Sequence, residues 1–127
     1  MSETLSILVV DDYPPLAISL AEILDSKGFE VKTATSGTEA LQILQDHPVD
    51  VLLTNIMMPD MNGVELIRET KKILPGITAI FMTIESADDL VQRGVKEGIK
   101  AVLDKPVDVN FLVALFSTIK GGTSNSN

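Results

Sequence analysis

Four short apolar runs in this chain each end in polar residues that a buried strand has no reason to carry. The runs and their polar ends are Ile7 to Val10 into Asp11 and Asp12, Val51 to Leu53 into Thr54 and Asn55, Ile80 to Met82 into Thr83, and Val102 and Leu103 into Asp104, Lys105 and Pro106. In an open parallel sheet the carboxyl ends of the strands meet at one edge, which is where such folds place their sites. The pattern therefore predicts one small pocket holding acids, an amide, a hydroxyl and an ammonium, a set that suits magnesium and a phosphoryl group.

Strand-like runs alternate with helix-like segments along the whole chain. The expected strands are Leu5 to Val10, Phe29 to Ala34, Val49 to Thr54, Thr78 to Met82 and Ala101 to Leu103. The expected helices run from Pro14 to Gly28, from Ser36 to about Asp46, from about Val64 to Ile73, from Ala87 to about Lys96, and from Asp108 through Ile119. Short connections and right-handed crossovers then favour an α/β fold, a doubly wound five-stranded parallel sheet with helices on both faces.

Local signals mark where several of these helices begin and what they bury. Ser36 and Glu39 have the spacing of a capping box, and Asp108 can cap the last helix. The core stripe expected for the first helix consists of Leu16, Leu20, Ile23 and Leu24. Three further apolar residues lie off that stripe and form a modest second face beside the predicted pocket, namely Ala17, Ile18 and Ala21.

Length and composition limit the class of protein. The chain has 127 residues, enough for one domain that buries roughly two thirds of its unfolded surface. It has no Cys, which excludes disulfides and thiolate metal sites, and its net charge of -8 argues against direct nucleic-acid binding. No apolar stretch approaches the roughly 20 residues of a membrane span, and no export signal is evident, so the cytoplasm is the expected location. We expect one domain over residues 1–120, with residues 121–127 as a flexible tail or truncated linker.

Each candidate site residue also has an ordinary interpretation. Adjacent Asp11 and Asp12 could be a solvated helix start, although neighbouring like charges favour a compensating cation such as magnesium. Lys105 could be a surface lysine, but Pro106 follows it at a strand end, where a point charge could neutralise a phosphoryl oxygen. Met57 and Met58 are expected to pack rather than to bind metal, because soft sulfur does not match the surrounding oxygen ligands. Asp104 is expected to be a solvated neighbour of Lys105, and His47, beside Pro48, is expected to be a loop histidine.

Taken together, the motifs ILVVDD, VLLTNIMMPDMNG, IFMT and LDKP resemble the receiver domain of two-component response regulators, over about residues 5 to 120. The resemblance implies a flavodoxin-like (βα)5 fold. It also implies that Asp11, Asp12 and the backbone carbonyl of Met57 bind Mg²⁺, and that Thr83 and Lys105 contact the incoming phosphoryl group. In this family an aspartate accepts phosphate from the phosphohistidine of a histidine kinase. That position holds Asn55.

The amide at position 55 changes the expected chemistry. A carboxylate oxygen is a charged nucleophile, whereas resonance weakens the oxygen of an amide and its nitrogen is not basic, so Asn55 should not accept phosphate. An aspartate here would give the pocket three acids and one lysine, a net charge of -2; with Asn55 the net charge is -1. Removing one carboxylate about 4 Å from a divalent ion could weaken binding by up to several kcal/mol at an effective dielectric near 20. We therefore expect weak Mg²⁺ binding. An engineered acceptor replacement and a natural pseudo-receiver both explain Asn55.

The leading hypothesis is a non-enzymatic receiver module for two-component, or phosphorelay, signal transduction. The family implies a histidine kinase or phosphotransfer protein as partner, with an effector domain or a weak homodimer as further possibilities. The alternative is a magnesium-dependent phosphatase with an aspartyl nucleophile. Such enzymes generally need two acids spaced by one residue after the first strand, whereas Asp11 and Asp12 are adjacent. A nucleotide-binding module is disfavoured because no glycine-rich loop follows the first strand.

Further expectations concern the surroundings of the pocket. Ile84 stands where the family often has a small residue and could narrow the entrance, and Val102 stands where it often has a switching aromatic ring. We also expect a cis peptide bond between Lys105 and Pro106. Contacts through the mixed-charge face of the fourth helix should be weak and salt-sensitive; that face comprises Asp88, Asp89, Gln92, Arg93 and Lys96.

Overall fold

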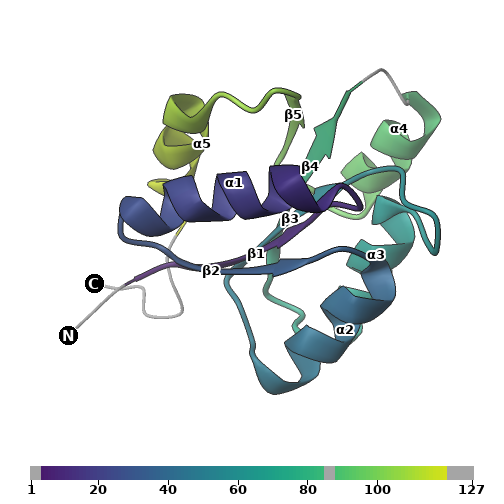
Figure 1. Cartoon of the computed structure of the whole chain (residues 1–127). Helices are drawn as coiled ribbons and strands as arrows, with labels where there is room; N and C mark the ends of the chain where they lie inside the picture. The colour runs from purple at the N-terminus through teal and green to yellow at the C-terminus, as the bar shows by residue number, and fades with distance from the viewer. Residues whose placement is uncertain (1–3, 85–87, 120–127) are drawn as a thin grey trace.

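The computed structural model describes residues 4–84 and 88–119 and contains a five-stranded, all-parallel sheet. The strands are β1 (Ser6–Val10), β2 (Glu30–Ala34), β3 (Val51–Asn55), β4 (Thr78–Thr83) and β5 (Ala101–Asp104). They lie side by side in the order β2-β1-β3-β4-β5 (Figure 1). The prediction of a doubly wound parallel sheet is confirmed.

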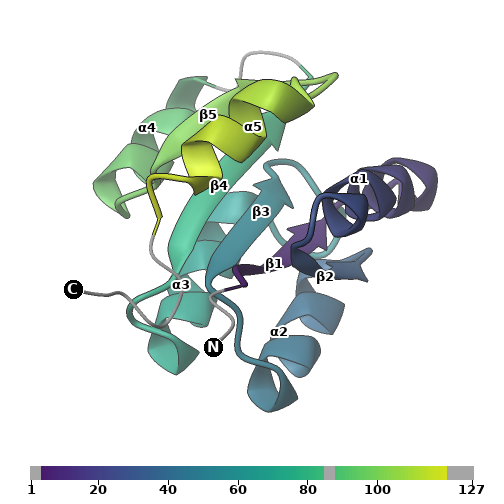
Figure 2. The same cartoon turned by 90° about the vertical axis from the view of Figure 1, so that its left-hand side faces the viewer.

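Helices cover both faces of this sheet. They are α1 (Pro14–Ser26), α2 (Gly37–Asp46), α3 (Gly63–Ile73), α4 (Asp88–Lys96) and α5 (Val109–Phe116). Figure 1 shows α1 and α5 above the sheet and α2 and α3 below it, and Figure 2 shows the same layers after a quarter turn. The expected start of the fourth helix at Ala87 lies outside the described residues. None of the helices in the described part of the chain is long and apolar enough to cross a membrane.

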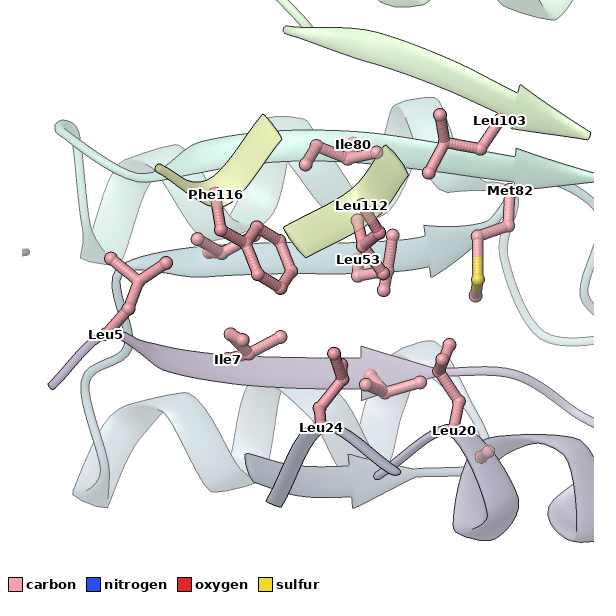
Figure 3. Close-up of a cluster of buried hydrophobic side chains, with 13 residues drawn as sticks. Leu5, Ile7, Leu20, Leu24, Leu53, Ile80, Met82, Leu103, Leu112 and Phe116 are labelled. Carbon is pink, nitrogen blue, oxygen red and sulfur yellow. The ribbon is translucent and has the colours of Figure 1, made fainter. Parts of the chain in front are cut away.

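Alternation along the central strands builds two separate cores. Ile7 and Val9 of β1 face α1 and α5, where Leu24 and Phe116 meet them (Figure 3). Leu8 and Val10 point to the opposite face and pack against α2 and α3. Because both faces are buried, the strands are apolar throughout rather than alternating with polar residues. Polar side chains can therefore enter these central strands only at their ends, which is where the predicted pocket lies.

The first helix buries a different stripe from the one predicted. Ala17 is fully buried together with Leu20 and Leu24, whereas Ile23 is 40% exposed. Positions 17, 20 and 24 have the spacing of one helical face. The prediction chose the longer side chains at 16 and 23 instead of Ala17. A small residue at position 17 allows α1 to approach the sheet closely. The predicted second face is thus wrong for Ala17, and Ile18 is its exposed member, at 50%.

The last helix ends earlier than predicted, at Phe116 rather than at Ile119. The Ser117 and Thr118 hydroxyls donate hydrogen bonds to the carbonyls three residues before them, and the N–H groups of Thr118 and Ile119 also bond three residues back. Hydroxyls that bond to nearby carbonyls compete with the helical pattern, so the chain tightens into a turn. Ile119 still packs against the core. The expected tail at residues 121–127 lies outside the described residues.

Capping was only partly predicted. The Ser36 hydroxyl accepts the Glu39 N–H at 3.0 Å as expected, but the Glu39 carboxylate accepts from the Thr35 N–H rather than from Ser36. A complete capping box lies instead at the start of α3. There the Asn62 side chain accepts from the Glu65 N–H, and the Glu65 carboxylate accepts from the Asn62 N–H, both at 2.9 Å. This box fixes the end of the loop that follows β3.

Candidate functional site

The predicted polar residues meet at the carboxyl edge of the sheet. β1, β3 and β4 are neighbours in register, with Val10 beside Thr54 and Asn55 beside Met82. Thr83 pairs with Asp104 across β4 and β5. The residues that follow these positions, Asp11 after β1 and Lys105 after β5, are thereby carried to the same edge. Their convergence follows from strand order alone.

A buried ion pair forms one side of this pocket. The Lys105 ammonium donates to Asp11 Oδ2 at 2.5 Å, and the two side chains are 7% and 1% exposed. The other oxygen of Asp11 accepts the Tyr13 N–H at 2.9 Å. Lys105 is therefore not the surface lysine of the ordinary interpretation, because its charge is held against the first acid of the pair. The peptide bond between Lys105 and Pro106 is cis, as predicted.

The Asn55 carboxamide forms the other side of the pocket. Its nitrogen donates one hydrogen bond to Asp12 Oδ1 at 3.0 Å and another to the backbone carbonyl of Met57 at 2.9 Å. Both partners can only accept hydrogen bonds, so only the nitrogen end of the amide can face them. Asn55 thus joins the second acid after β1 to the loop that follows β3.

Three large apolar side chains stand around the pocket. Ile84, Tyr13 and Met57 are 76%, 62% and 61% exposed, the three highest values among the exposed large hydrophobic residues of the described chain. Each lies within two residues of a site residue, at the ends of three neighbouring strands. The prediction that Met57 packs is therefore wrong, whereas Met58 does pack against the core. The Met57 backbone carbonyl accepts the Asn55 amide, while its side chain faces solvent.

The remaining residues singled out in the sequence lie at or near the ends of strands and helices. Thr83 is 8% exposed at the end of β4. Asp104 is exposed, in agreement with its expected solvation, and His47 is exposed directly after α2. Val102 is 37% exposed on the edge strand β5. Ile84 follows Thr83 and is largely exposed.

One polar contact near the site escaped sequence analysis. The Asp60 carboxylate accepts from the backbone N–H groups of Gly37 and Thr38, at 3.2 and 2.8 Å, and from the Thr38 hydroxyl at 2.8 Å. The hydrogen bond from the Thr38 N–H is the main reason that the pKa of Asp60 is lowered from its ordinary value of 3.8. Asp60 therefore holds the loop after β3, which also carries Met57, against the amino terminus of α2. The Pro59-Asp60 turn was visible in the sequence, but its distant partner was not.

The three groups expected to bind magnesium do not fit that ion in their present arrangement. Asp11 is engaged by Lys105 and by the Tyr13 N–H, while Asp12 and the Met57 carbonyl are both engaged by Asn55. Magnesium requires near-octahedral oxygen ligands at about 2.0–2.1 Å. The pocket satisfies its own polar groups instead.

Known proteins resemble this chain in both sequence and fold. A family model described as the response regulator receiver domain matches residues 7–117. A response regulator receiver protein from Anaeromyxobacter sp. (strain Fw109-5) is 45% identical over 102 residues, which are 80% of this chain and 43% of that protein. This chain thus spans less than half the length of that relative.

Solved structures agree with the flavodoxin-like receiver fold. A response regulator receiver domain protein from Methanospirillum hungatei JF-1, described as CheY-like, has a TM-score of 0.85 and 29% identity, covering 91% of this chain and 92% of that one. A response regulator protein from Burkholderia pseudomallei, solved with a phosphorylated aspartic acid, a calcium ion and citrate, has a TM-score of 0.79 and 25% identity. The match covers 86% of this chain and 64% of that one.

Proposed function

This chain belongs to the response regulator receiver family of two-component signal transduction, and we propose that it works as a receiver module that does not accept phosphate. Receiver domains are in general signalling modules rather than enzymes. One observation carries the proposal: the residue at the end of β3 is Asn55, and it turns its amide nitrogen toward Asp12 and Met57. The acceptor position therefore presents no nucleophile.

The other residues of the pocket would suit phosphoryl chemistry if a carboxylate were present. Lys105 supplies a positive charge and Thr83 a hydroxyl at the strand ends beside position 55. The Burkholderia relative carries its phosphate on an aspartic acid. In an Asn55→Asp variant, a carboxylate oxygen would attack the phosphorus as the bond to the leaving group breaks, and the product would be an acyl phosphate. The Asn55 amide cannot take this first step.

We infer that Mg²⁺ binds weakly to the Asn55 form. A divalent ion, where bound, would offset the negative charge of Asp11, Asp12 and an incoming phosphoryl group. With Asn55 the acids are instead balanced by Lys105 and by hydrogen bonds. The internal contacts would have to open before an ion could enter.

We propose that a partner protein binds in the groove between α1 and the loop that leads into α5. It has a volume of about 370 Å³ and lies next to the pocket. Its lining includes Tyr13, Leu16, Ile23, Pro106 and Val107. An apolar groove along a helix suits a helix of a histidine kinase or phosphotransfer protein. The 43% coverage of the Anaeromyxobacter relative leaves room for an effector domain in a longer protein.

Self-association would use the other side of the molecule. The Arg93–Asp89 ion pair on α4 is 3.3 Å long, and both side chains are largely exposed, so any contact through that face should be weak and salt-sensitive.

The phosphatase alternative gains nothing from the geometry. Asp11, the first acid after β1, already accepts hydrogen bonds on both oxygens.

The test is phosphorylation by a small phosphodonor with magnesium, followed by intact mass measurement. We expect no added phosphate on the Asn55 protein and one phosphate on Asn55→Asp. Gln45→Glu, which adds the same charge on exposed α2 away from the pocket, should behave like the Asn55 protein. Phosphate on the Asn55 protein would overturn the proposal, and so would an Asn55→Asp protein that is folded but takes up none.

A further inference from the structure

The Asn55 amide does more than remove a charge from the pocket. Its nitrogen contacts Asp12 Oδ1 and the Met57 carbonyl, the two oxygens that a divalent ion would have to bring together. It therefore occupies the space between them and satisfies both. A residue that only lacked a carboxylate would have left these oxygens to water.

Geometry separates the amide-bridged pocket from an ion-binding one. The two N–H bonds of an amide point about 120° apart, so with ideal hydrogen bonds of 3.0 and 2.9 Å the two acceptors would lie about 5 Å from each other. Two ligands of one octahedral Mg²⁺ are at most about 4.2 Å apart, because each lies about 2.1 Å from the ion. Bringing in the ion thus requires the amide to leave, and either the exposed Asp12 side chain or the loop after β3 to move inward.

That loop is held in place from its other end. The Asp60 carboxylate is bound to the amino terminus of α2, and the Asn62–Glu65 capping box fixes the start of α3. Met57 lies on the same loop, three residues before Asp60. Closing the loop around an ion would therefore work against contacts that are already made.

We propose that the Asn55 carboxamide is a built-in replacement for the divalent cation, cross-linking Asp12 to the Met57 carbonyl and competing with Mg²⁺ for these two oxygens. The inference deepens the proposed function and rests on it. It differs from a simple loss of charge in one measurable respect. If Asn55 only lacks a charge, then Asn55→Ala, which is equally neutral, binds Mg²⁺ no better. If Asn55 blocks the site, removing its side chain opens the site.

The experiment is a Mg²⁺ titration followed by the fluorescence of Tyr13. The chain has one Tyr and no Trp, and the backbone N–H of Tyr13 bonds to Asp11, so the only tyrosine signal comes from a residue next to the acid pair. We expect Asn55→Ala to bind Mg²⁺ about tenfold more tightly than the Asn55 protein, since two hydrogen bonds no longer have to be broken. Asn55→Asp should bind most tightly. Equal or weaker binding by Asn55→Ala would overturn the proposal.

A second variant guards against a folding defect. Asn55→Ser has a single hydroxyl donor and can satisfy at most one of the two acceptors, so it should also bind Mg²⁺ more tightly than the Asn55 protein. Circular dichroism would confirm that each variant is folded, and Gln45→Glu serves as the remote control. Phosphodonor labelling separates the two proposals. If the Asn55 protein takes up no phosphate but its Ala and Ser variants bind Mg²⁺ no more tightly than it does, only the cation replacement is refuted. If the Asn55 protein takes up phosphate, the proposed function is refuted.

Discussion

Removing the Lys105 ammonium should destabilise the protein strongly, because it leaves Asp11 buried and charged. The Lys105 and Asp11 side chains are 7% and 1% exposed and lie 2.5 Å apart. Breaking a buried pair of this kind usually costs about 3–5 kcal/mol. Asp11 keeps the Tyr13 N–H as a partner, so we expect the lower end, about 3 kcal/mol, for Lys105→Met. At about 2 cal/mol/K of unfolding entropy per residue, this corresponds to about 10 °C in Tm for a chain of this length.

Urea unfolding followed by circular dichroism would measure this loss, and a double-mutant cycle would assign it to the pair. Asp11→Asn combined with Lys105→Met should be less destabilising than the sum of the single changes, with a coupling of about 2 kcal/mol. Lys72→Met is a matched control. Its ion pair with Glu69 is 3.0 Å long but exposed, and should contribute less than about 1 kcal/mol. Additive single changes, or a Lys105→Met variant as stable as the Lys72→Met control, would refute the reasoning.

Two further changes test the packing and the loop beside the pocket. Gly94→Ala should destabilise by up to about 2 kcal/mol in urea unfolding, because an added Cβ would lie 2.4 Å from the buried Phe81 ring and the overpacking outweighs the gain in helix propensity. Gly76→Ala, which meets open space, is its control, and equal stability of the two variants would contradict the packing. Asp60→Asn should lower Tm at neutral pH. Because the pKa of Asp60 is lowered, its stabilising contribution is present above pH 3.8 and is lost as the pH falls through the lowered pKa, so the difference in Tm from the parent should shrink in acid. A difference that is independent of pH would argue against this role.

The fold and the composition of the pocket could be predicted because both depend on local patterns. Continuous apolar runs such as Ile7 to Val10 indicate strands buried on both faces, and the parallel arrangement then brings their polar ends together. No knowledge of side-chain contacts is needed for that step. Asp11, Asn55, Thr83 and Lys105 were for this reason placed at one edge from the sequence alone.

The contacts within the pocket could not be predicted in the same way. Which oxygen the Asn55 amide faces depends on the relative positions of β1 and the loop after β3, which lie 43 residues apart in sequence at Asp12 and Asn55. The Asp60 contact with Thr38 spans 22 residues and has no sequence periodicity. Ala17 was misjudged because size was taken as a guide to burial, although a small residue can be the one that lets a helix approach the sheet.

The central claim, that the Asn55 amide stands in for a cation, is tested most directly by NMR of its side-chain NH2 group. Both protons are donated to fixed acceptors, Asp12 Oδ1 and the Met57 carbonyl. We predict two well-separated proton resonances that exchange slowly with solvent and do not move when millimolar Mg²⁺ is added. Resonances that exchange freely, or that shift together with those of Asp12 and Met57 as Mg²⁺ is added, would contradict the account.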